Sequence, residues 1–356
     1  MTLQDRPARR AFRSALVIVL PIASVLVSLA AAEGLLRMGG YQYSPLNLTN
    51  EAVSKHDYRH MFFTHECFQF DPKLIWRPRP GHQVFNEQGF RGDLLEKEHL
   101  SRTIVTLGDS NTLGRFDHKA WPAHLKDRLG RERVRVVNAG VWGYTVLQGV
   151  ERFKRDIASK PPHIVTISFG GNDPAFAGWP DRDYIQGKLW TESLIPNWRL
   201  TELTRSFYDW LFTPKLDPSA PRQLRVKPEE YADGLNVLIR ESKWLGTTPV
   251  LLTRPTRADN TQNVERLARY NQIVRQVAGE NDVLLIDAAA VFANRLEPFL
   301  DECHFTEAGH EEMGALVASA LRPLLEGKGP SRSHATVLDV LRNLNNPPPV
   351  LVRSVP

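Results

Sequence analysis

The chain has 356 residues, of which 42% are hydrophobic and 24% are charged, and it contains two cysteines. This composition excludes global disorder and a disulfide-rich scaffold, and the presence of only one long apolar run excludes a polytopic membrane protein. The length indicates two domains, or one large domain with attachments. The net charge of +5 does not indicate a nucleic-acid partner, because much of the excess lies in four arginines within residues 6–13.

Residues 14–32 carry no formal charge and form the long apolar run. A helix of this length spans roughly 28 Å, which matches the hydrocarbon core of a bilayer. The arginines before it predict a cytoplasmic stub at 1–13 and export of the rest of the chain. We therefore predict a transmembrane anchor at 14–36 and an extracytoplasmic body, which is periplasmic in a Gram-negative cell. A cleaved signal peptide stays open as the alternative, because Ala30-Ala31-Ala32 offers a cleavage site, although the apolar run exceeds the roughly 7–15 residues usual in such peptides.

Two further segments lack the regular pattern of a folded core. Residues 37–100 are aromatic and basic without clean periodicity, which predicts an extended arm that packs on the main domain. Residues 329–356 contain one weak helical stretch followed by three consecutive prolines, which predicts a partly ordered tail. The main domain is therefore expected at 101–328.

The main domain alternates short apolar runs with segments of helical spacing. The runs rich in β-branched residues lie at 103–107, 134–137, 164–169, 250–253 and 283–286. The segments with helical spacing lie at 121–129, 146–157, 229–245, 264–278 and 306–325. Because the strands are apolar on both faces, this alternation predicts a five-stranded parallel sheet between two helical layers, an α/β fold.

An insert at 174–227 interrupts this alternation after the third strand. It contains Trp179, Trp190, Trp198 and Trp210, half of the eight tryptophans in the chain. A structureless loop of this length is improbable in a compact domain unless it serves a function. We predict that the insert contains a helix near 201–212 and covers another part of the molecule.

Unusual polar and glycine residues follow four of the predicted strands. Ser110 follows the first strand in Gly108-Asp109-Ser110, and Gly143 follows the second. Asn172 follows the third strand, and the segment from Asp301 to His304 follows the fifth and opens the last helix. Because ligands bind at the carboxyl ends of parallel strands, these residues are expected to meet at one edge of the sheet.

These residue types supply the parts of an acyl-transfer site. A serine at a strand-to-helix turn is exposed for attack, a histidine accepts its proton, and a carboxylate three residues earlier orients the imidazole. The Ser110 backbone N–H, the Gly143 N–H and the Asn172 side-chain amide provide three donors for an oxyanion hole. Each part alone is a weak signal, but their order and their placement after four different strands are specific.

The four motifs resemble those of the SGNH (GDSL-type) hydrolase superfamily, serine esterases and lipases on a flavodoxin-like α/β/α sandwich. The resemblance covers about residues 103–325 and implies that Ser110 is the nucleophile, His304 the base and Asp301 its partner, with Gly143 and Asn172 in the oxyanion hole. An arm motif from Asn86 to Gly92 is similar to the lead-in of membrane-anchored bacterial members.

The sequence departs from the family pattern at Asn111, where Leu or Phe is common. We expect this residue to face the acyl site, so the departure leaves the substrate class open. A conventional α/β-hydrolase is disfavoured, because the motif Gly-x-Ser-x-Gly is absent around Ser110.

Other polar residues near these motifs are interpreted as structural. Asp109 and Asp173 are expected to bond to backbone in their turns, and Asn138 is expected to tie its strand end to a neighbouring segment. His118 and His124 are too close to Ser110 in the sequence to be favoured as the base.

The two cysteines, Cys67 and Cys303, lie in a body that we expect to be exported to an oxidising compartment. A disulfide between them is therefore permitted, and it would pin the arm beside the His304 segment; two separate buried thiols are the alternative. Neither cysteine belongs to a metal-ligand spacing, and the predicted chemistry requires no cofactor, so we expect neither a metal nor a cofactor.

Three functions are consistent with these motifs. The first is a membrane-tethered esterase or O-acyl transferase that acts on acylated carbohydrate, on whose sugar rings the tryptophan-rich insert stacks. The second is a lipase or lysophospholipase whose tryptophans enter the membrane surface. The third is an inactive scaffold that binds glycan, against which the complete set of catalytic residues argues.

Overall fold

The computed structural model describes residues 5–41, 67–71, 73–96, 102–131, 133–177, 180–185, 198–212, 223–259 and 261–327. The chain divides into two compact units. One comprises Met1–Asn47 and Lys188–Lys215, and the other comprises Leu48–Gly187 and Leu216–Pro356. The middle of the insert thus belongs to the same unit as the N-terminal helix. The sequence pattern did not predict this grouping. All of the predicted catalytic residues lie in the second unit.

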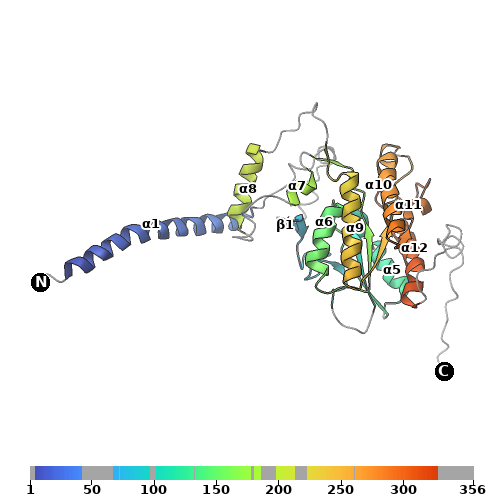
Figure 1. The fold of residues 1–356 in the computed structure, drawn as a ribbon, viewed down its shortest axis with the longest axis horizontal. Coiled ribbons are helices and arrows are strands. Elements are labelled where there is room, and N and C mark those ends of the chain that lie inside the picture. Colours follow the sequence, from blue (N-terminus) through green and yellow to red (C-terminus); the bar gives the residue numbers. More distant parts are fainter. Residues whose placement is uncertain are drawn as a thin grey trace, which may run out of the picture. The chain divides into compact units, whose positions relative to one another are not determined.

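The second unit is built on a six-stranded sheet with the strand order β10-β9-β6-β4-β5-β3. Figure 1 labels the main helices that surround this sheet. Its strands are β3 (Arg91–Gly92), β4 (Arg102–Gly108), β5 (Val134–Asn138), β6 (Ile164–Ser168), β9 (Thr248–Leu252) and β10 (Leu284–Ile286). Every pairing among the last five is parallel, which confirms the predicted five-stranded parallel sheet. The arm adds β3 as an antiparallel edge strand beside β5. This strand has only two residues, so the sequence pattern did not predict it.

Helices cover both faces of this sheet. They are the short α4 (Ser110–Leu113) and α11 (Ala288–Val291), and α5 (Trp121–Leu129), α6 (Val146–Arg152), α9 (Pro228–Trp244), α10 (Thr261–Glu280) and α12 (Glu307–Leu325). A π-helical segment, Phe153–Ile157, continues α6. Helix α5 packs against α12, whereas α6 and α10 both pack against α9.

The core follows from the alternation of side chains along each strand. Ile104 and Ile164 are buried with Leu125 of α5 and Leu316 of α12 in one cluster. Since neighbouring strand residues point to opposite faces, the equally buried Val105 lies on the other side of the sheet. This arrangement confirms the predicted three-layer α/β/α sandwich.

The described residues of the arm from Cys67 onward pack on the sheet unit. It forms an antiparallel hairpin from β1 (Phe68–Asp71) and β2 (Ile75–Pro78). Trp76 of this hairpin donates through Nε1 to the Trp142 carbonyl at 3.0 Å and accepts the Tyr144 hydroxyl on its own carbonyl at 2.6 Å. The hairpin therefore contacts the loop that carries Gly143.

The two ends of the insert are joined to each other by a small antiparallel pair, β7 (Phe176–Ala177) and β8 (Gln223–Leu224), and α7 (Asp181–Ile185) lies between these strands in the sequence. Helix α8 (Arg199–Phe212) confirms the helix predicted near residue 201. Trp179 and Trp190 lie outside the described residues, so the predicted covering role of the insert stays a prediction.

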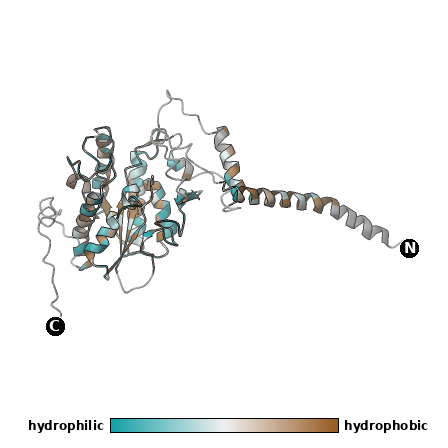
Figure 2. Cartoon of the chain, turned by 180° about the vertical axis from the view of Figure 1, so that it is seen from behind, coloured by the Kyte–Doolittle hydropathy of each residue, from teal (hydrophilic) through white to brown (hydrophobic). Residues whose placement is uncertain are grey.

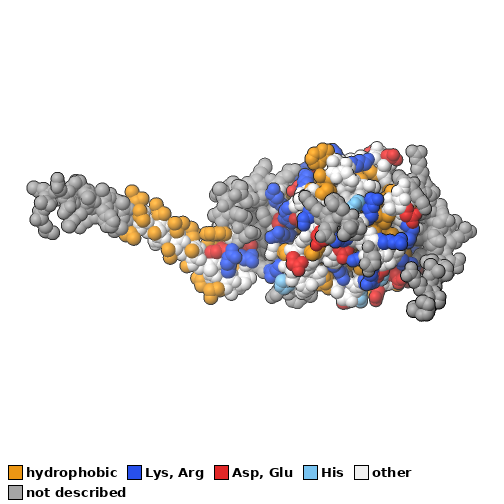
Figure 3. All heavy atoms as spheres, turned by 90° about the horizontal axis from the view of Figure 1, so that it is seen from below, with side chains coloured by type: hydrophobic (Ala, Val, Ile, Leu, Met, Phe, Trp, Pro, Cys, Tyr) orange, Lys and Arg blue, Asp and Glu red, His pale blue; other side chains and the backbone are white. Residues whose placement is uncertain are grey.

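The N-terminal helix α1 (Asp5–Met38) contains one segment, Val17–Met38, that is long and apolar enough to cross a membrane. Between Val17 and Leu29 its large hydrophobic side chains are 41–72% exposed. Figure 2 shows this apolar stretch in brown. Figure 3 shows its hydrophobic side chains in orange, with charged side chains gathered beyond them at the C-terminal end of the helix.

Candidate active site

The nucleophile turn begins where β4 ends. Asp109 caps α4 by accepting the Asn111 N–H on its Oδ1 at 2.9 Å. A Cβ on Gly108 would lie 2.6 Å from the Ser168 carbonyl oxygen, so the close approach of β6 requires glycine at this position. The turn places Ser110 at the first position of α4, with its side chain at the edge of a cavity.

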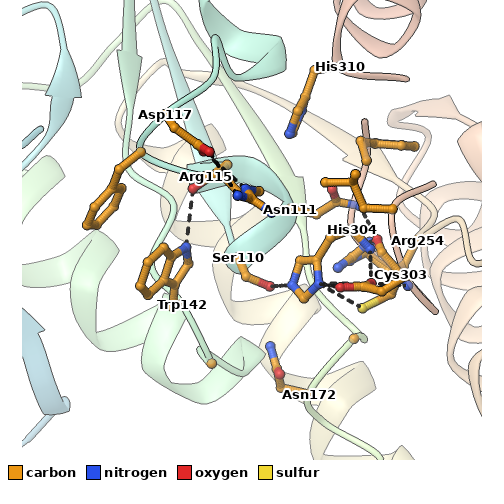
Figure 4. Close-up of a pocket in the computed structure, with 17 residues that line it drawn as sticks. Ser110, Asn111, Arg115, Asp117, Trp142, Asn172, Arg254, Cys303, His304 and His310 are labelled. Carbon is orange, nitrogen blue, oxygen red and sulfur yellow. Dashed lines mark hydrogen bonds and ion pairs between the residues drawn. The ribbon is translucent and has the colours of Figure 1, made fainter. Parts of the chain in front are cut away.

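Ser110, His304 and Asp301 form a continuous hydrogen-bonded relay. Figure 4 labels Ser110 and His304 and shows their side chains pointing toward one another. The Ser110 Oγ lies 2.9 Å from His304 Nε2, and His304 Nδ1 lies 2.8 Å from Asp301 Oδ2. Asp301 Oδ1 also accepts the backbone N–H groups of Cys303 and His304, at 2.9 and 2.8 Å. The carboxylate therefore shapes the same loop that carries the imidazole, and the spacing of three residues brings both groups into one turn.

The contacts within the relay shift the pKa values of His304 and Asp301 in opposite directions. Burial by itself lowers the pKa of His304, but the Cys303 sulfur and the Asp301 carboxylate outweigh it and raise that pKa above its ordinary value. Partial burial disfavours the Asp301 carboxylate, yet the hydrogen bonds from His304 outweigh this cost and hold the pKa of Asp301 well below its usual range. Asp301 is therefore ionised and favours the imidazolium that forms when Ser110 loses its proton.

Gly143 and Asn172 line the same cavity as Ser110. Gly143 has a φ of 73°, a left-handed conformation that favours glycine. The Asn172 amide donates to the Tyr144 carbonyl at 3.0 Å, so the side chain is held against the loop that follows Gly143. The structure thus brings both predicted oxyanion donors to the serine.

Asp173 connects these two loops, in agreement with its predicted structural role. Its Oδ1 accepts the Val146 N–H and its Oδ2 accepts the Gly170 N–H, each at 2.9 Å. Complete burial raises the pKa of Asp173 to about 7, although both backbone bonds oppose the shift.

Arg225 supports the oxyanion loop from the end of the insert. Its guanidinium donates through Nη1 to the Gly143 carbonyl at 2.8 Å. Its Nε and Nη2 form a two-pronged ion pair with Asp181, at 3.0 and 2.9 Å, and both side chains are buried. Sequence reasoning missed this pair because the two residues lie 44 positions apart, towards opposite ends of an insert whose sequence has no regular pattern.

Arg254 supports the turn that carries Ser110. Sequence reasoning did not single out this residue either. Its Nε forms a fully buried ion pair with Asp109 Oδ2 at 2.9 Å, and its Nη1 donates to the Cys303 carbonyl at 3.3 Å. Asn111 donates to the same carbonyl through Nδ2 at 3.0 Å. The residue that departs from the family pattern thus lines the cavity, as expected, and in addition connects the serine turn to the histidine loop.

The cavity above the serine has a volume of about 550 Å³. One wall is aromatic: the rings of Phe116 and Trp142 are stacked with centroids 4.5 Å apart and planes inclined by 13°. The exposed Arg115 and Asp117 pair at 2.8 Å beside this wall. Arg91 of the arm motif donates to three carbonyls of the loop that bears these residues. The arm therefore shapes the substrate cavity.

A second described histidine lines the cavity beside the relay. His310 is buried in the cavity lining, where its Nδ1 accepts the Trp121 N–H at 3.3 Å, and burial lowers its pKa to about 3. Asn138 ties its strand end to the nucleophile segment by donating to the Thr112 carbonyl at 2.8 Å, as predicted.

The possible disulfide between Cys67 and Cys303 is not formed, and both residues are free thiols. Cys67 is completely buried at the start of the arm hairpin, where burial raises its pKa to about 12. Cys303 instead lines the cavity, with its Sγ 3.8 Å from His304 Nδ1. Of the two alternatives left open by the sequence, the structure agrees with two separate thiols, because Cys67 is buried at the start of the hairpin whereas Cys303 lines the cavity.

Asp301, Cys303 and His304 bring three potential metal-ligand atoms within 4.8 Å of one another. The carboxylate and imidazole atoms of this group already form the hydrogen bonds of the relay, so we assign no metal to it.

Comparisons with known proteins agree with this geometry. Residues 106–312 match the GDSL-like Lipase/Acylhydrolase family. Esterase TesA from Pseudomonas aeruginosa is 37% identical over 84 residues, which cover 22% of this chain and 42% of that protein, less than half of its length. An acetylxylan esterase from Geobacillus stearothermophilus is 26% identical over 185 residues, 50% of this chain and 67% of that protein.

Among solved structures, the crystal structure of an acetylxylan esterase from Geobacillus stearothermophilus is similar, with a TM-score of 0.43 and 21% sequence identity. The similarity covers 63% of this chain and 94% of that one. The family match spans more than half of the chain and contains the serine, both oxyanion residues and the Asp–His pair. The chain belongs to the GDSL-like lipase/acylhydrolase family of the SGNH hydrolase superfamily.

Proposed function

We propose that this protein is a membrane-anchored, extracytoplasmic serine esterase that cleaves or transfers O-acyl groups on carbohydrate. The observation that carries the proposal is the relay from Ser110 through His304 to Asp301, with Gly143 and Asn172 facing the same cavity. Intact catalytic geometry argues against the alternative of an inactive glycan-binding scaffold.

The reaction follows from these positions. His304 Nε2 accepts the Ser110 proton as Oγ attacks the ester carbonyl, and the N–H groups of Ser110 and Gly143 and the Asn172 amide stabilise the oxyanion. The tetrahedral intermediate collapses, His304 returns the proton to the leaving alcohol, and the acyl group stays on Ser110. Attack by water on this acyl-serine releases the acid, whereas attack by a sugar hydroxyl completes a transfer.

The carbohydrate substrate is supported by the cavity wall and by one relative. The stacked Phe116 and Trp142 rings provide an apolar platform, and the adjacent Arg115 and Asp117 provide charged hydrogen-bonding groups for hydroxyls. The acetylxylan esterase from Geobacillus stearothermophilus aligns with half of this chain. Together these observations support an acetyl group on a sugar as the substrate.

A lysophospholipase activity is the second candidate. A protein from Escherichia coli named thioesterase 1/protease 1/lysophospholipase L1 is 37% identical over 73 residues, 20% of this chain and 35% of that protein. Such an activity requires room for a long acyl chain, so the acyl-length preference distinguishes the two candidates.

The location is proposed from α1. The segment Val17–Met38 supports a membrane anchor, and the arginines before it favour a cytoplasmic N-terminus. A single span then places the catalytic unit outside the cytoplasm.

The full chain in detergent should be assayed with acetyl, butyryl and octanoyl aryl esters and with acetylated xylooligosaccharides, beside a Ser110→Ala control. We expect kcat/KM to be highest for acetyl esters, with release of acetate from the sugar. A preference for octanoate would support the lysophospholipase instead. Absence of turnover on every ester by the folded protein would support the scaffold, and mass analysis of added acceptor sugars separates transfer from hydrolysis.

A further inference from the structure

Helix α8 packs against the C-terminal part of α1 within the first unit. Glu33 of α1 accepts the backbone N–H of Leu200, in the first turn of α8, at 3.0 Å and pairs with Arg37 at 2.6 Å. The hydroxyls of Tyr41 and Ser206 lie 2.6 Å apart. Polar contacts therefore fix α8 to the end of the apolar helix.

The described side chains of α8 are arranged in the reverse of the pattern expected for a helix on the surface of a water-soluble protein. Its polar residue Glu202 is only 7% exposed, whereas Leu203, Phe207 and Leu211 are 41%, 59% and 49% exposed. A spacing of four residues places these three on one stripe of the helix. A helix that faced water would bury such a stripe, so this stripe is suited to an apolar environment.

The same apolar environment surrounds α1 in the proposed anchor. The uncharged run of α1 ends at Glu33, the residue that binds the start of α8. Beyond it, Leu35 and Met38 are exposed beside the charged Arg37. Mixed apolar and charged groups at the end of a spanning helix are typical of the layer where hydrocarbon meets headgroups, and α8 is attached at this level.

We propose that α8 is an interfacial membrane helix, with Leu203, Phe207 and Leu211 inserted between the lipid headgroups and acyl chains. A helix with Leu and Phe on one face and polar groups on the other binds this layer in the membrane plane. The inference rests on the proposed anchor, because α8 reaches the bilayer through α1. The insert then acts as a second membrane contact.

The test uses the full chain in phosphatidylcholine nanodiscs, in a Cys303→Ser background that leaves only the buried Cys67. A nitrobenzoxadiazole fluorophore is attached to Leu203→Cys or, as a second position on the stripe, to Leu211→Cys. Thr201→Cys is the matched control, because at about 100° per residue it lies about 160° around the helix from Leu203. Val25→Cys reports on the anchor itself.

We expect doxyl groups near the top of the acyl chains to quench the probes at 203 and 211 at least twofold more than the probe at 201. Deeper doxyl groups should quench the probe at 25. Quenching at 25 without quenching at 203 and 211 would overturn the inference and leave the anchor intact. A probe at 203 shielded from aqueous iodide but not quenched by lipid would mean that protein covers the stripe, which also overturns it. Absence of quenching at 25 would overturn the anchor as well.

Discussion

Arg225 holds the peptide carbonyl of Gly143 at 2.8 Å, so a guanidinium from the insert fixes the loop that carries an oxyanion donor. The remaining nitrogens of Arg225 are committed to the buried Asp181. One side chain therefore connects the folding of the insert to the geometry of catalysis.

Arg225→Lys should separate these two roles. A lysine ammonium keeps the charge opposite Asp181 but cannot contact both carboxylate oxygens and the Gly143 carbonyl in one fork. We expect kcat to fall by about 10- to 100-fold with little change in KM, because the oxyanion donor is displaced. Arg225→Met should cost about 3–5 kcal/mol in the free energy of unfolding, since Asp181 is left buried and unpaired. Arg240→Met, at an exposed ion pair, is the control and should cost less than about 1 kcal/mol. Unchanged kcat in Arg225→Lys would contradict the positioning role.

Ser110→Ala should abolish ester hydrolysis while leaving the thermal unfolding midpoint nearly unchanged. The Ser110 side chain lies partly exposed at the cavity and contributes little to the core. Kinetics with an acetyl aryl ester and calorimetry of the same preparation measure the two effects. Turnover retained by the folded variant would rule out the serine mechanism.

Asn172→Ala should lower the rate by roughly 10²–10³-fold, mainly in kcat, because it removes one oxyanion donor. The comparison needs both kcat and KM on a single substrate. An increase confined to KM would instead assign Asn172 to binding of the ground state.

The acid limb of kcat/KM should reflect the raised pKa of His304. Protonated His304 cannot accept the Ser110 proton, so activity should fall as the pH decreases through a midpoint above 6.5, the ordinary histidine value. Asp301→Asn removes the charge beside Nδ1, so the midpoint should move down while kcat falls by about 10⁴-fold. An acid limb that stays in place in Asp301→Asn would show that Asp301 does not control this pKa.

Thiol labelling should distinguish the two cysteines. Under native conditions a maleimide should modify Cys303, which lines the cavity, and spare the buried Cys67. Denaturation without reductant should make both available, as a mass shift of two labels. If the denatured, non-reduced protein takes up no label, Cys67 and Cys303 are joined by a disulfide after all.

Much of the fold was predictable because the spacing of apolar residues in the sequence indicates which side chains of a strand or helix are buried. The helix at 121–129 was predicted with the bounds of α5. The alternation of strands with helices along the chain predicted the parallel sheet. The antiparallel β3 was not predictable, since a two-residue strand has no period of its own.

The candidate site divides in the same way. Residues that follow strands, such as Ser110 and Asn172, could be placed at one edge by topology alone. Arg225 and Arg254 act through single long side chains that reach across the fold, and nothing in their local sequence signals those partners. The sequence could not decide between a disulfide and two separate thiols for a related reason. The distance between two cysteines depends on how the arm pairs and packs, whereas the compartment determines only whether a bond is chemically permitted.

The three hydrogen bonds from Arg91 to the cavity loop have a practical consequence for the design of a shorter fragment that lacks α1. A fragment cut at residue 101 would lose an edge strand of the sheet and the guanidinium that shapes one side of the substrate cavity. The smallest active fragment should therefore begin no later than Cys67, so that the β1–β2 hairpin and the Asn86–Gly92 turn are retained. The arm is therefore a structural part of the enzyme and not only a connection between α1 and the sheet unit.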